Sequence, residues 1–501
     1  MPFPMRRFKA CRCSRPHRIR ITSMPFGIWR AKCWRIMTRR TPMIQKLSDI
    51  QKDNLTKRNS ALHSTRMEGA FREIRDMDYE YSADIGLAYA SPVRGVWNIV
   101  HIATLVPQGH QIFVCPTSCL RGVVLTTAEL GRMDKMSTIT VGEENILEGD
   151  MEEMLQHGVE RVIRELPEKP RMMMIFTSCI HHFMAVNYQR VYNILAKEFP
   201  EIDFVDCYMD PIMRRTNPVV PSLWRQMHRV LRYTEAKNPK QVTLLGNCFP
   251  HEGAYCDLVS LLEANGIKVL EACNCKDYDE YLTMAESTCN FLFHKSGIAA
   301  AKDLEIRQKQ PWYRMRPGYA YDEYDEDLRK AASILGIPEP KQSFLDSEKA
   351  RTEACIRETQ SLLEDTPVSI DYTAVDCPLE LAQFLLDHGF NVESVMVDNF
   401  TESEDVFQKL RNTKPTLRIY ETYGWNIRQM QRVHAGKILC IGQKSAYFMD
   451  SDYFVNEVEN AGMYGYRGLR RLMDLISDAF RNPKPMRDLV QVKGWECECG
   501  E

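Results

Sequence analysis

Two stretches of the sequence share one pattern, in which an apolar, strand-like run ends in a cysteine. They are HQIFVCPTSCLRG (residues 110–122) and RMMMIFTSCIHHF (residues 171–183). Between them lies MEEMLQHGVERVIREL (residues 151–166), whose apolar spacing fits an amphipathic helix. Short β-rich runs that alternate with such helices are typical of βα units in a parallel sheet. Because the carboxyl ends of parallel strands lie at one edge of a sheet, we expect Cys115 and Cys179 to project into the same region.

The same alternation extends over most of the chain and divides it into three blocks. The first block predicts strands at 110–115, 137–142, 171–179 and 203–209. The second and third blocks each contain the same order of a strand, a helix and a second strand. Gly266 and Gly389 each stand where the glycine that ends a helix belongs. We therefore predict an α/β fold of three doubly wound, Rossmann-like parallel-sheet domains with helical connectors.

The domain boundaries follow from changes in composition. We expect a basic leader outside any fold at 1–42 and a helical segment with little core at 43–84. The three α/β domains are then predicted at 85–238, 239–365 and 366–482, with a tail at 483–501. The second range includes a polar, helical connector from Pro311 to Thr366.

The formal net charge of −2 conceals an uneven distribution. Twelve of the 65 Lys and Arg residues stand among the first 40 residues, which contain no Asp or Glu, so the remaining chain carries 53 basic against 67 acidic residues. This acidic body excludes a general nucleic-acid-binding role, although the leader alone could also be read as a transit peptide or a basic arm. No apolar run is long enough to cross a membrane. We expect a cytoplasmic protein with neither nucleic-acid nor membrane partners.

The sequence contains 17 cysteines, and most of them are expected to be buried small residues rather than disulfides in a reducing compartment. Thiolates at converging strand ends are ligands for soft metals or iron–sulfur clusters, although the spacing of Cys115, Cys119 and Cys179 matches no zinc-ribbon or ferredoxin pattern. His181 and His182 follow Cys179, and we expect one to be buried and hydrogen-bonded and the other to be exposed. The loop at 246–257 lacks a glycine-rich phosphate-binding pattern, so we expect no nucleotide on this chain.

Longer stretches resemble one known family. The segment from Ile139 to Val191, the segment VTLLGNCFPHEGAYCDLVSLLEANGIKVLE (residues 242–271), and the pair ILCIGQKSAYF and NAGMYGYRGLRRLMDLI (438–448 and 460–476) are similar to the nitrogenase component 1 family. The resemblance covers roughly residues 85–480. This family includes the nitrogenase α and β subunits, cofactor-assembly scaffolds and light-independent protochlorophyllide reductases.

The resemblance implies a set of cluster ligands. Cys115 matches the family's second cluster cysteine, and Cys179 matches the third. The first falls near residues 89–91, where this sequence has no cysteine. Cys119 is an additional thiol that lies one helical turn after Cys115, and we expect its sulfur to take the vacated place. The alternative is that Cys119 is only a small buried residue. The implied cofactor is an iron–sulfur cluster, either 4Fe–4S or a variant of the nitrogenase P-cluster.

The ligands of the nitrogenase catalytic cofactor are a Cys and a His. The place of the Cys falls near Phe293–His294, where Cys289 lies slightly too early, although His294 could ligate. The place of the His falls near Asn456, where no His stands. We therefore expect an oxidoreductase subunit that accepts electrons from an ATP-dependent iron–sulfur reductase and passes them to a substrate other than dinitrogen. The expected partners are that reductase and a sister component 1 subunit in a heterodimer or heterotetramer, or a second copy in a homodimer.

Two other functions fit the same residues. The chain could be a non-catalytic scaffold that holds a metal-cluster precursor for transfer, which is compatible with the missing cofactor ligands. It could also be an interaction subunit without metal. Turnover with reductase and ATP separates the first two, because a scaffold binds a cluster and reduces nothing.

Overall fold

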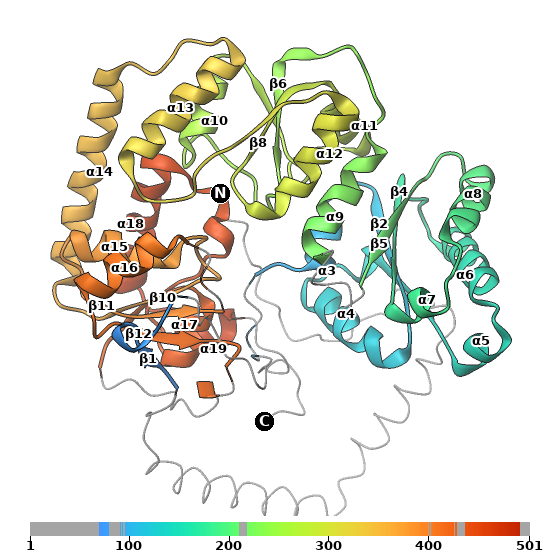
Figure 1. Cartoon of the computed structure of the whole chain (residues 1–501), viewed down its shortest axis with the longest axis horizontal. Coiled ribbons are helices and arrows are strands. Elements are labelled where there is room, and N and C mark those ends of the chain that lie inside the picture. The colour runs from blue at the N-terminus through green and yellow to red at the C-terminus, as the bar shows by residue number, and fades with distance from the viewer. Residues whose placement is uncertain are drawn as a thin grey trace, which may run out of the picture.

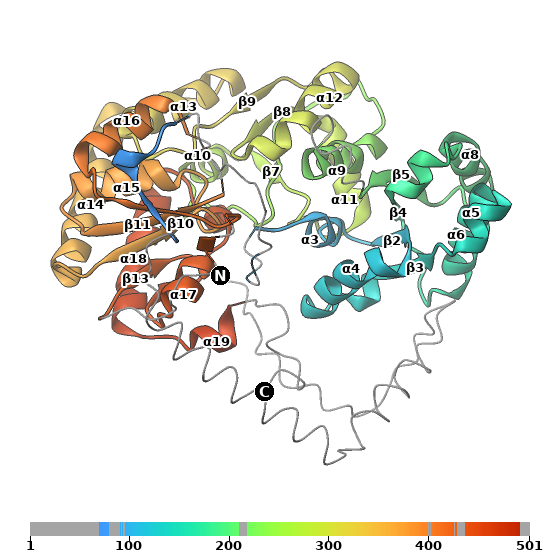
Figure 2. The same cartoon turned by 60° about the horizontal axis from the view of Figure 1, so that its bottom comes forward.

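A computed structural model describes residues 70–79, 91, 93, 96–209, 218–398, 400, 402–424, 426–427 and 436–490. Its three domains follow one another in an arc, so that the first and third both lie beside the second (Figure 1; Figure 2). The leader at 1–42, most of the segment at 43–84, and Cys497 and Cys499 lie outside the described residues.

Each domain is built on one sheet, and the strand orders are β3-β2-β4-β5, β7-β6-β8-β9 and β1-β12-β11-β10-β13-β14. Every pair of neighbouring strands in these sheets is parallel except β1 with β12. The prediction of an α/β fold with several parallel sheets flanked by helices is confirmed.

The first domain has four central strands that are largely buried, as the apolar runs predict. Its strands are β2 (Gly109–Cys115), β3 (Met136–Thr140), β4 (Met172–Thr177) and β5 (Asp203–Tyr208). Its helices are α3 (Ile99–Ala103), α4 (Thr117–Glu129), α5 (Glu143–Glu148), α6 (Met151–Glu165), α7 (Cys179–Phe183), α8 (Tyr188–Glu198) and α9 (Val219–Met227).

The second domain repeats this plan and continues into two long helices. Its strands are β6 (Asn238–Leu245), β7 (Lys268–Leu270), β8 (Ser287–Leu292) and β9 (Trp312–Arg314). Its helices are α10 (Asp257–Ala264), α11 (Tyr278–Leu282) and α12 (Ile298–Gln308), followed by α13 (Tyr321–Leu335) and α14 (Gln342–Leu363). Gly266 after α10 has a φ of +69° with open space around it, as expected for a glycine that ends a helix.

The third domain holds the largest sheet. Its strands are β1 (Arg72–Glu73), β10 (Val368–Asp371), β11 (Val392–Val397), β12 (Arg418–Glu421), β13 (Leu439–Ile441) and β14 (Phe454–Val455). Its helices are α15 (Pro378–Asp387), α16 (Glu404–Thr413), α17 (Gln443–Met449), α18 (Gly465–Arg481) and α19 (Met486–Leu489). Short 3-10 turns connect several elements in all three domains, at 74–76, 133–135, 228–230, 283–286, 295–297 and 459–462.

The chain reverses its direction across each sheet at one point. In the first sheet it passes from β2 to β3 on one side and then to β4 on the other, so the reversal lies between β2 and β4. The same construction places the reversals of the other sheets between β6 and β8 and between β10 and β13. Loops at such points leave a crevice at the carboxyl ends of the strands, where α/β proteins bind their ligands.

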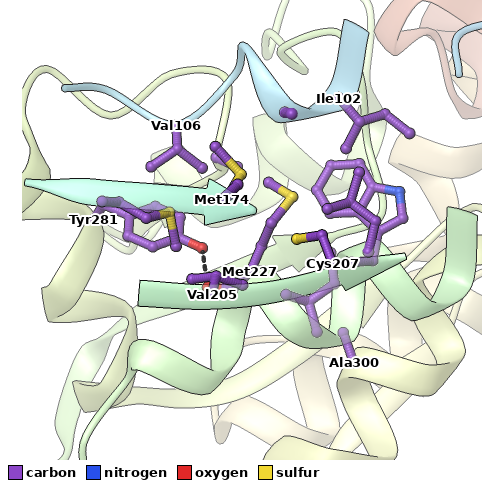
Figure 3. Packing of buried hydrophobic residues seen from close by; sticks show 14 of the residues in the cluster. Ile102, Val106, Met174, Val205, Cys207, Met227, Tyr281 and Ala300 are labelled. Carbon is purple, nitrogen blue, oxygen red and sulfur yellow. Dashed lines mark hydrogen bonds between the residues drawn. The ribbon is translucent and has the colours of Figure 1, made fainter. Parts of the chain in front are cut away.

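The first and second domains share one hydrophobic core. Figure 3 shows Met174 and Val205 of the first sheet packed near Met227 of α9, Tyr281 of α11 and Ala300 of α12. The Tyr281 hydroxyl donates a hydrogen bond to the Met227 carbonyl at 2.9 Å. A large apolar core of this kind holds the two sheets as one unit.

Two short strands differ from the sequence-based expectation. Within the segment predicted to be helical at 43–84, Arg72 and Glu73 form β1, which pairs antiparallel with β12. Ile74 and Met77 are buried in the core of the third domain. In the segment predicted as a helical connector, Trp312–Arg314 forms β9 and extends the second sheet. Both strands have too few residues to show an alternating pattern.

Among the described residues, no helix is long and apolar enough to cross a membrane.

Candidate functional site

The thiols of Cys115 and Cys179 lie at the reversal point of the first sheet. Cys115 is the last residue of β2, and Cys179 is the first residue of α7, two residues after the end of β4. The two strands pair in parallel, with Val114 opposite Thr177. The structure therefore brings these two predicted site residues to neighbouring strand ends.

Cys119 comes from the helix that follows β2. Helix α4 starts at Thr117, because Pro116 has an extended ψ and its backbone nitrogen carries no hydrogen to donate to a helical hydrogen bond. The backbone N–H of Cys119 donates to the Pro116 carbonyl at 2.9 Å, which places Cys119 in the first turn. Cys115 is fully buried, Cys179 is half-buried and Cys119 is exposed. The three sulfurs thus run from the core to the surface.

Burial dominates the electrostatics of Cys115. Burial raises the pKa of Cys115 to about 12, and the nearby Cys119 and Cys179 thiols raise it further. Iron in a cluster would supply a positive charge that favours the thiolate and would take the place of the proton.

The donor set fits an iron–sulfur cluster in its chemistry. The three thiols come from one strand end and two helix starts, which are rigid positions. A 4Fe–4S cluster takes four ligands, so a fourth would come from outside these three. Across the described ranges, no group of three or more Cys, His, Asp or Glu side chains is arranged to bind a single metal ion. Cluster ligands are spaced more widely, since each binds a different iron.

The two histidines beside Cys179 behave as expected. His181 is buried, with its Nδ1 within 3.4 Å of both the Ser178 backbone nitrogen and its hydroxyl, whereas His182 is exposed. Burial lowers the pKa of His181 to about 4, so its ring is neutral at physiological pH. At the place implied for a further cluster cysteine, Ser91 is buried, while its neighbours at 89 and 90 lie outside the described residues.

The side chains at the positions of the missing cofactor ligands take part in other contacts. Asn456 accepts a hydrogen bond from Gln443 Nε2 at 2.8 Å. Phe293 is buried and stacks on His251, with ring centroids 4.4 Å apart. Cys289 lies inside β8 with its sulfur fully buried in the core. None of these three side chains has the chemistry and exposure needed to bind a cofactor.

A second cluster of ionisable side chains lies between the second and third domains, and the sequence did not predict it. His294 follows β8, and its Nδ1 is 2.7 Å from Asp376 Oδ2 in the loop after β10. Glu459 accepts a hydrogen bond from the Trp97 backbone N–H at 3.1 Å and another from the Cys248 thiol. These residues are too far apart in sequence to form a motif. The available signal was that His294 ends the predicted strand at 289–294 and that Asp376 comes two residues after the predicted strand at 366–374.

Comparisons with known proteins agree with this geometry. Residues 101–481 match the family described as nitrogenase component 1 type oxidoreductase. Two solved structures, titled nitrogenase Cp1 at pH 6.5 and at pH 5, each superpose with a TM-score of 0.58. Their sequences are 14% and 11% identical to this chain, covering 80% and 83% of it and 95% and 94% of the known chains.

No curated protein matches the sequence. The two structures are similar in fold, and the family match spans more than half of the chain. This protein therefore belongs to the nitrogenase component 1 type oxidoreductase family.

Proposed function

We propose that this chain is a nitrogenase-like oxidoreductase subunit that holds an iron–sulfur cluster on Cys115, Cys119 and Cys179. The cluster accepts single electrons from a separate ATP-dependent iron–sulfur reductase and passes them to a substrate other than dinitrogen. The observation that carries this proposal is the convergence of three thiols at the reversal point of the first sheet, inside a fold of the component 1 family.

The proposal of a substrate other than dinitrogen rests on the residues at the positions of the family's cofactor ligands. Asn456 and Phe293 stand where the family places its cofactor ligands, and both are engaged in other contacts. An iron–molybdenum type cofactor would lack its usual Cys and His ligands here. A 4Fe–4S cluster on thiolates remains the redox centre that these residues support.

The surface around the thiols supports a partner subunit. Cys119 is exposed, and the helices at the same sheet edge expose apolar side chains. Phe183 on α7 is 70% exposed, Leu147 on α5 is 86% exposed, and Met184 follows α7. Apolar residues gathered beside a site favour contact with another protein. A sister component 1 subunit, or a second copy of this chain, would cover the cluster and supply its fourth ligand.

The test is electron transfer to the cluster. The anaerobically reconstituted full chain is mixed with the reductase and dithionite, and its electron paramagnetic resonance spectrum is recorded with and without MgATP. We expect a reduced-cluster signal that requires both the reductase and MgATP. A cluster that stays oxidised under all these conditions would overturn the oxidoreductase proposal.

A scaffold for cluster assembly is the second candidate. The exposure of Cys119 favours it, because a ligand open to solvent allows a cluster to be handed to an acceptor. Incubation of the loaded chain with an apo-ferredoxin, followed by separation of the two proteins, measures transfer. Iron that moves to the acceptor without ATP-dependent reduction of the chain would favour the scaffold.

A further inference from the structure

His181 is a buried histidine two residues after Cys179, and one of its ring nitrogens lacks a partner. Its side chain is fully buried, on the short helix α7 that begins with Cys179. Its Nε2 is enclosed by protein and has no hydrogen-bond partner among the described residues. In the same domain, the buried His110 has its Nε2 2.9 Å from the Ser137 hydroxyl. Because a buried polar nitrogen without a partner is costly, Nε2 marks a place where a partner belongs.

The other ring nitrogen of His181 determines which tautomer is present. The Ser178 backbone N–H donates to His181 Nδ1 at 3.4 Å, and the Ser178 hydroxyl lies 3.3 Å from the same atom. These contacts form a capping box at the start of α7. A ring nitrogen that accepts a hydrogen bond carries no proton, so the proton of the neutral ring is on Nε2. The buried Nε2–H is therefore a hydrogen-bond donor that lacks an acceptor.

The capping contacts hold the ring at the strand ends that carry the thiols. Ser178 follows Thr177, the last residue of β4, and Thr177 pairs with Val114 in β2. Cys115 follows Val114, so the same register places Ser178 beside Cys115, on neighbouring strands that are ~4.8 Å apart. Cys179 is the next residue after Ser178. The residue that anchors the ring thus adjoins two of the three proposed cluster ligands, one across the sheet and one along the chain.

We propose that His181 Nε2–H donates a hydrogen bond to an anionic sulfur of the iron–sulfur cluster, a cysteine thiolate or a cluster sulfide, and thereby raises its reduction potential. This inference rests on the cluster of the proposed function, because the acceptor belongs to that cluster. Hydrogen bonds to the sulfurs are one of the ways in which a protein sets the potential of a cluster. A donor stabilises the more negative, reduced cluster more than the oxidised one. His181 binds no iron in this role, because its Nε2 keeps its proton.

Three variants separate this hydrogen bond from the helix cap. His181→Asn keeps an acceptor for the Ser178 N–H but has no donor at the place of Nε2. In α5, Asn145 stands at the same capping position and accepts from the Gly142 N–H at 3.0 Å, so an asparagine suits this cap. His181→Gln can place an amide N–H near the position of Nε2. His182→Asn is the matched control, because His182 is the next residue and is exposed.

The first measurement is the reduction potential of the cluster in the reconstituted full chain. The cluster is titrated with redox mediators and followed by electron paramagnetic resonance, and iron content is assayed in each protein. The potential should be lower in His181→Asn than in the wild type, closer to the wild type in His181→Gln, and unchanged in His182→Asn. Iron content should be equal in all four proteins. A wild-type potential in His181→Asn would overturn the inference.

The second measurement detects the hydrogen bond itself. In ¹⁵N-histidine-labelled protein, pulsed electron paramagnetic resonance of the reduced cluster should show a weak coupling to one histidine nitrogen. This coupling should persist in His182→Asn and disappear in His181→Asn. If the wild type shows no coupling, or the strong coupling of a nitrogen bound to iron, His181 is not the proposed donor.

A third measurement needs neither a cluster nor a variant that folds. In the metal-free wild type, ¹⁵N nuclear magnetic resonance should place the ring proton of His181 on Nε2. A proton on Nδ1 would leave Nε2 unable to donate and would overturn the inference.

The outcomes distinguish this inference from the proposed function. A cluster that titrates as expected in all variants but is not reduced by the reductase with MgATP would overturn the proposed function and leave the role of His181 standing. A cluster that the reductase reduces, with the same potential in the wild type and His181→Asn, would overturn only the role of His181. A wild type without a cluster would overturn both.

Discussion

His294 Nδ1 and Asp376 Oδ2 lie 2.7 Å apart, although one follows a strand of the second sheet and the other a strand of the third. This ion pair joins two domains at the points where their chains reverse. A half-buried pair of this kind contributes to stability.

The pair predicts a defined dependence of stability on pH. The pKa of His294 is raised from 6.5 to about 9 on folding. A raised pKa gives stability that is fully present below pH 6.5 and is lost as pH rises through 9. The shift corresponds to about 3 kcal/mol. Chemical unfolding of the wild type should show this loss between pH 6.5 and 9.5, and Asp376→Asn should remove most of it. An equal pH dependence in both proteins would contradict the assignment.

The left-handed turn at 459–462 predicts different costs for two glycine substitutions. In Gly462→Ala, the new Cβ would stand 2.3 Å from the Pro250 carbonyl oxygen, a backbone atom that cannot turn aside. Gly266 has a φ of +69°, similar to the +78° of Gly462, with nothing within 4 Å. Gly266→Ala should therefore cost only the left-handed conformation, ~1–2 kcal/mol. Gly462→Ala should cost clearly more, measured as the shift in unfolding midpoint. Equal costs would show that the turn is not held against Pro250.

Helix α4 offers a substitution that should stabilise the protein. Gly122 lies inside this helix, and a Cβ there would meet nothing within 4 Å. Gly122→Ala should raise the free energy of unfolding by ~0.5–1 kcal/mol, because alanine loses less backbone entropy in a helix. Since the new Cβ at Gly122 would touch no neighbour, iron binding should be unchanged. A loss of stability would indicate that α4 is not helical at this position.

The three thiols should differ in reactivity before a cluster is present. Cys119 is exposed, whereas Cys115 is buried with a pKa raised to about 12. In metal-free protein at pH 7.5, iodoacetamide should modify Cys119 rapidly and leave Cys115 unmodified. After reconstitution, Cys119 should be protected. Peptide mass spectrometry measures both states, and a Cys119 that reacts equally with and without iron would not be a ligand.

Much of the fold follows from local sequence patterns. The apolar run at 110–115 and the run at 171–179 predict β2 and β4, and Gly389 marks the end of the helix at 378–387. Strand β1 could not be predicted, because Arg72 and Glu73 are polar and are held only by pairing with β12. Local propensity carries no information about such a distant partner.

The thiol site and the cluster around His294 also differ in how far the sequence alone predicts them. Cys115 and Cys179 could be placed together because one ends a strand and the other closely follows one, and parallel topology then brings the two strand ends to one edge. The contacts between His294, Asp376 and Glu459 depend on how the second and third domains pack. That packing includes buried aromatic contacts such as Phe293 with Tyr464, whose ring centroids are 4.8 Å apart. Neither the composition nor the spacing of the chain specifies these contacts.

The iron content of the reconstituted protein tests the central claim most directly. The wild type and the variants Cys115→Ser, Cys119→Ser, Cys179→Ser and Cys207→Ser are reconstituted anaerobically, desalted and assayed for iron per chain. Cys207 is the control, since it is buried in the core of the same domain. We predict a brown wild type with cluster iron, a severe loss of iron in the first three variants, and wild-type iron in Cys207→Ser. Background iron in the wild type, or full iron in Cys115→Ser and Cys179→Ser, would contradict the account.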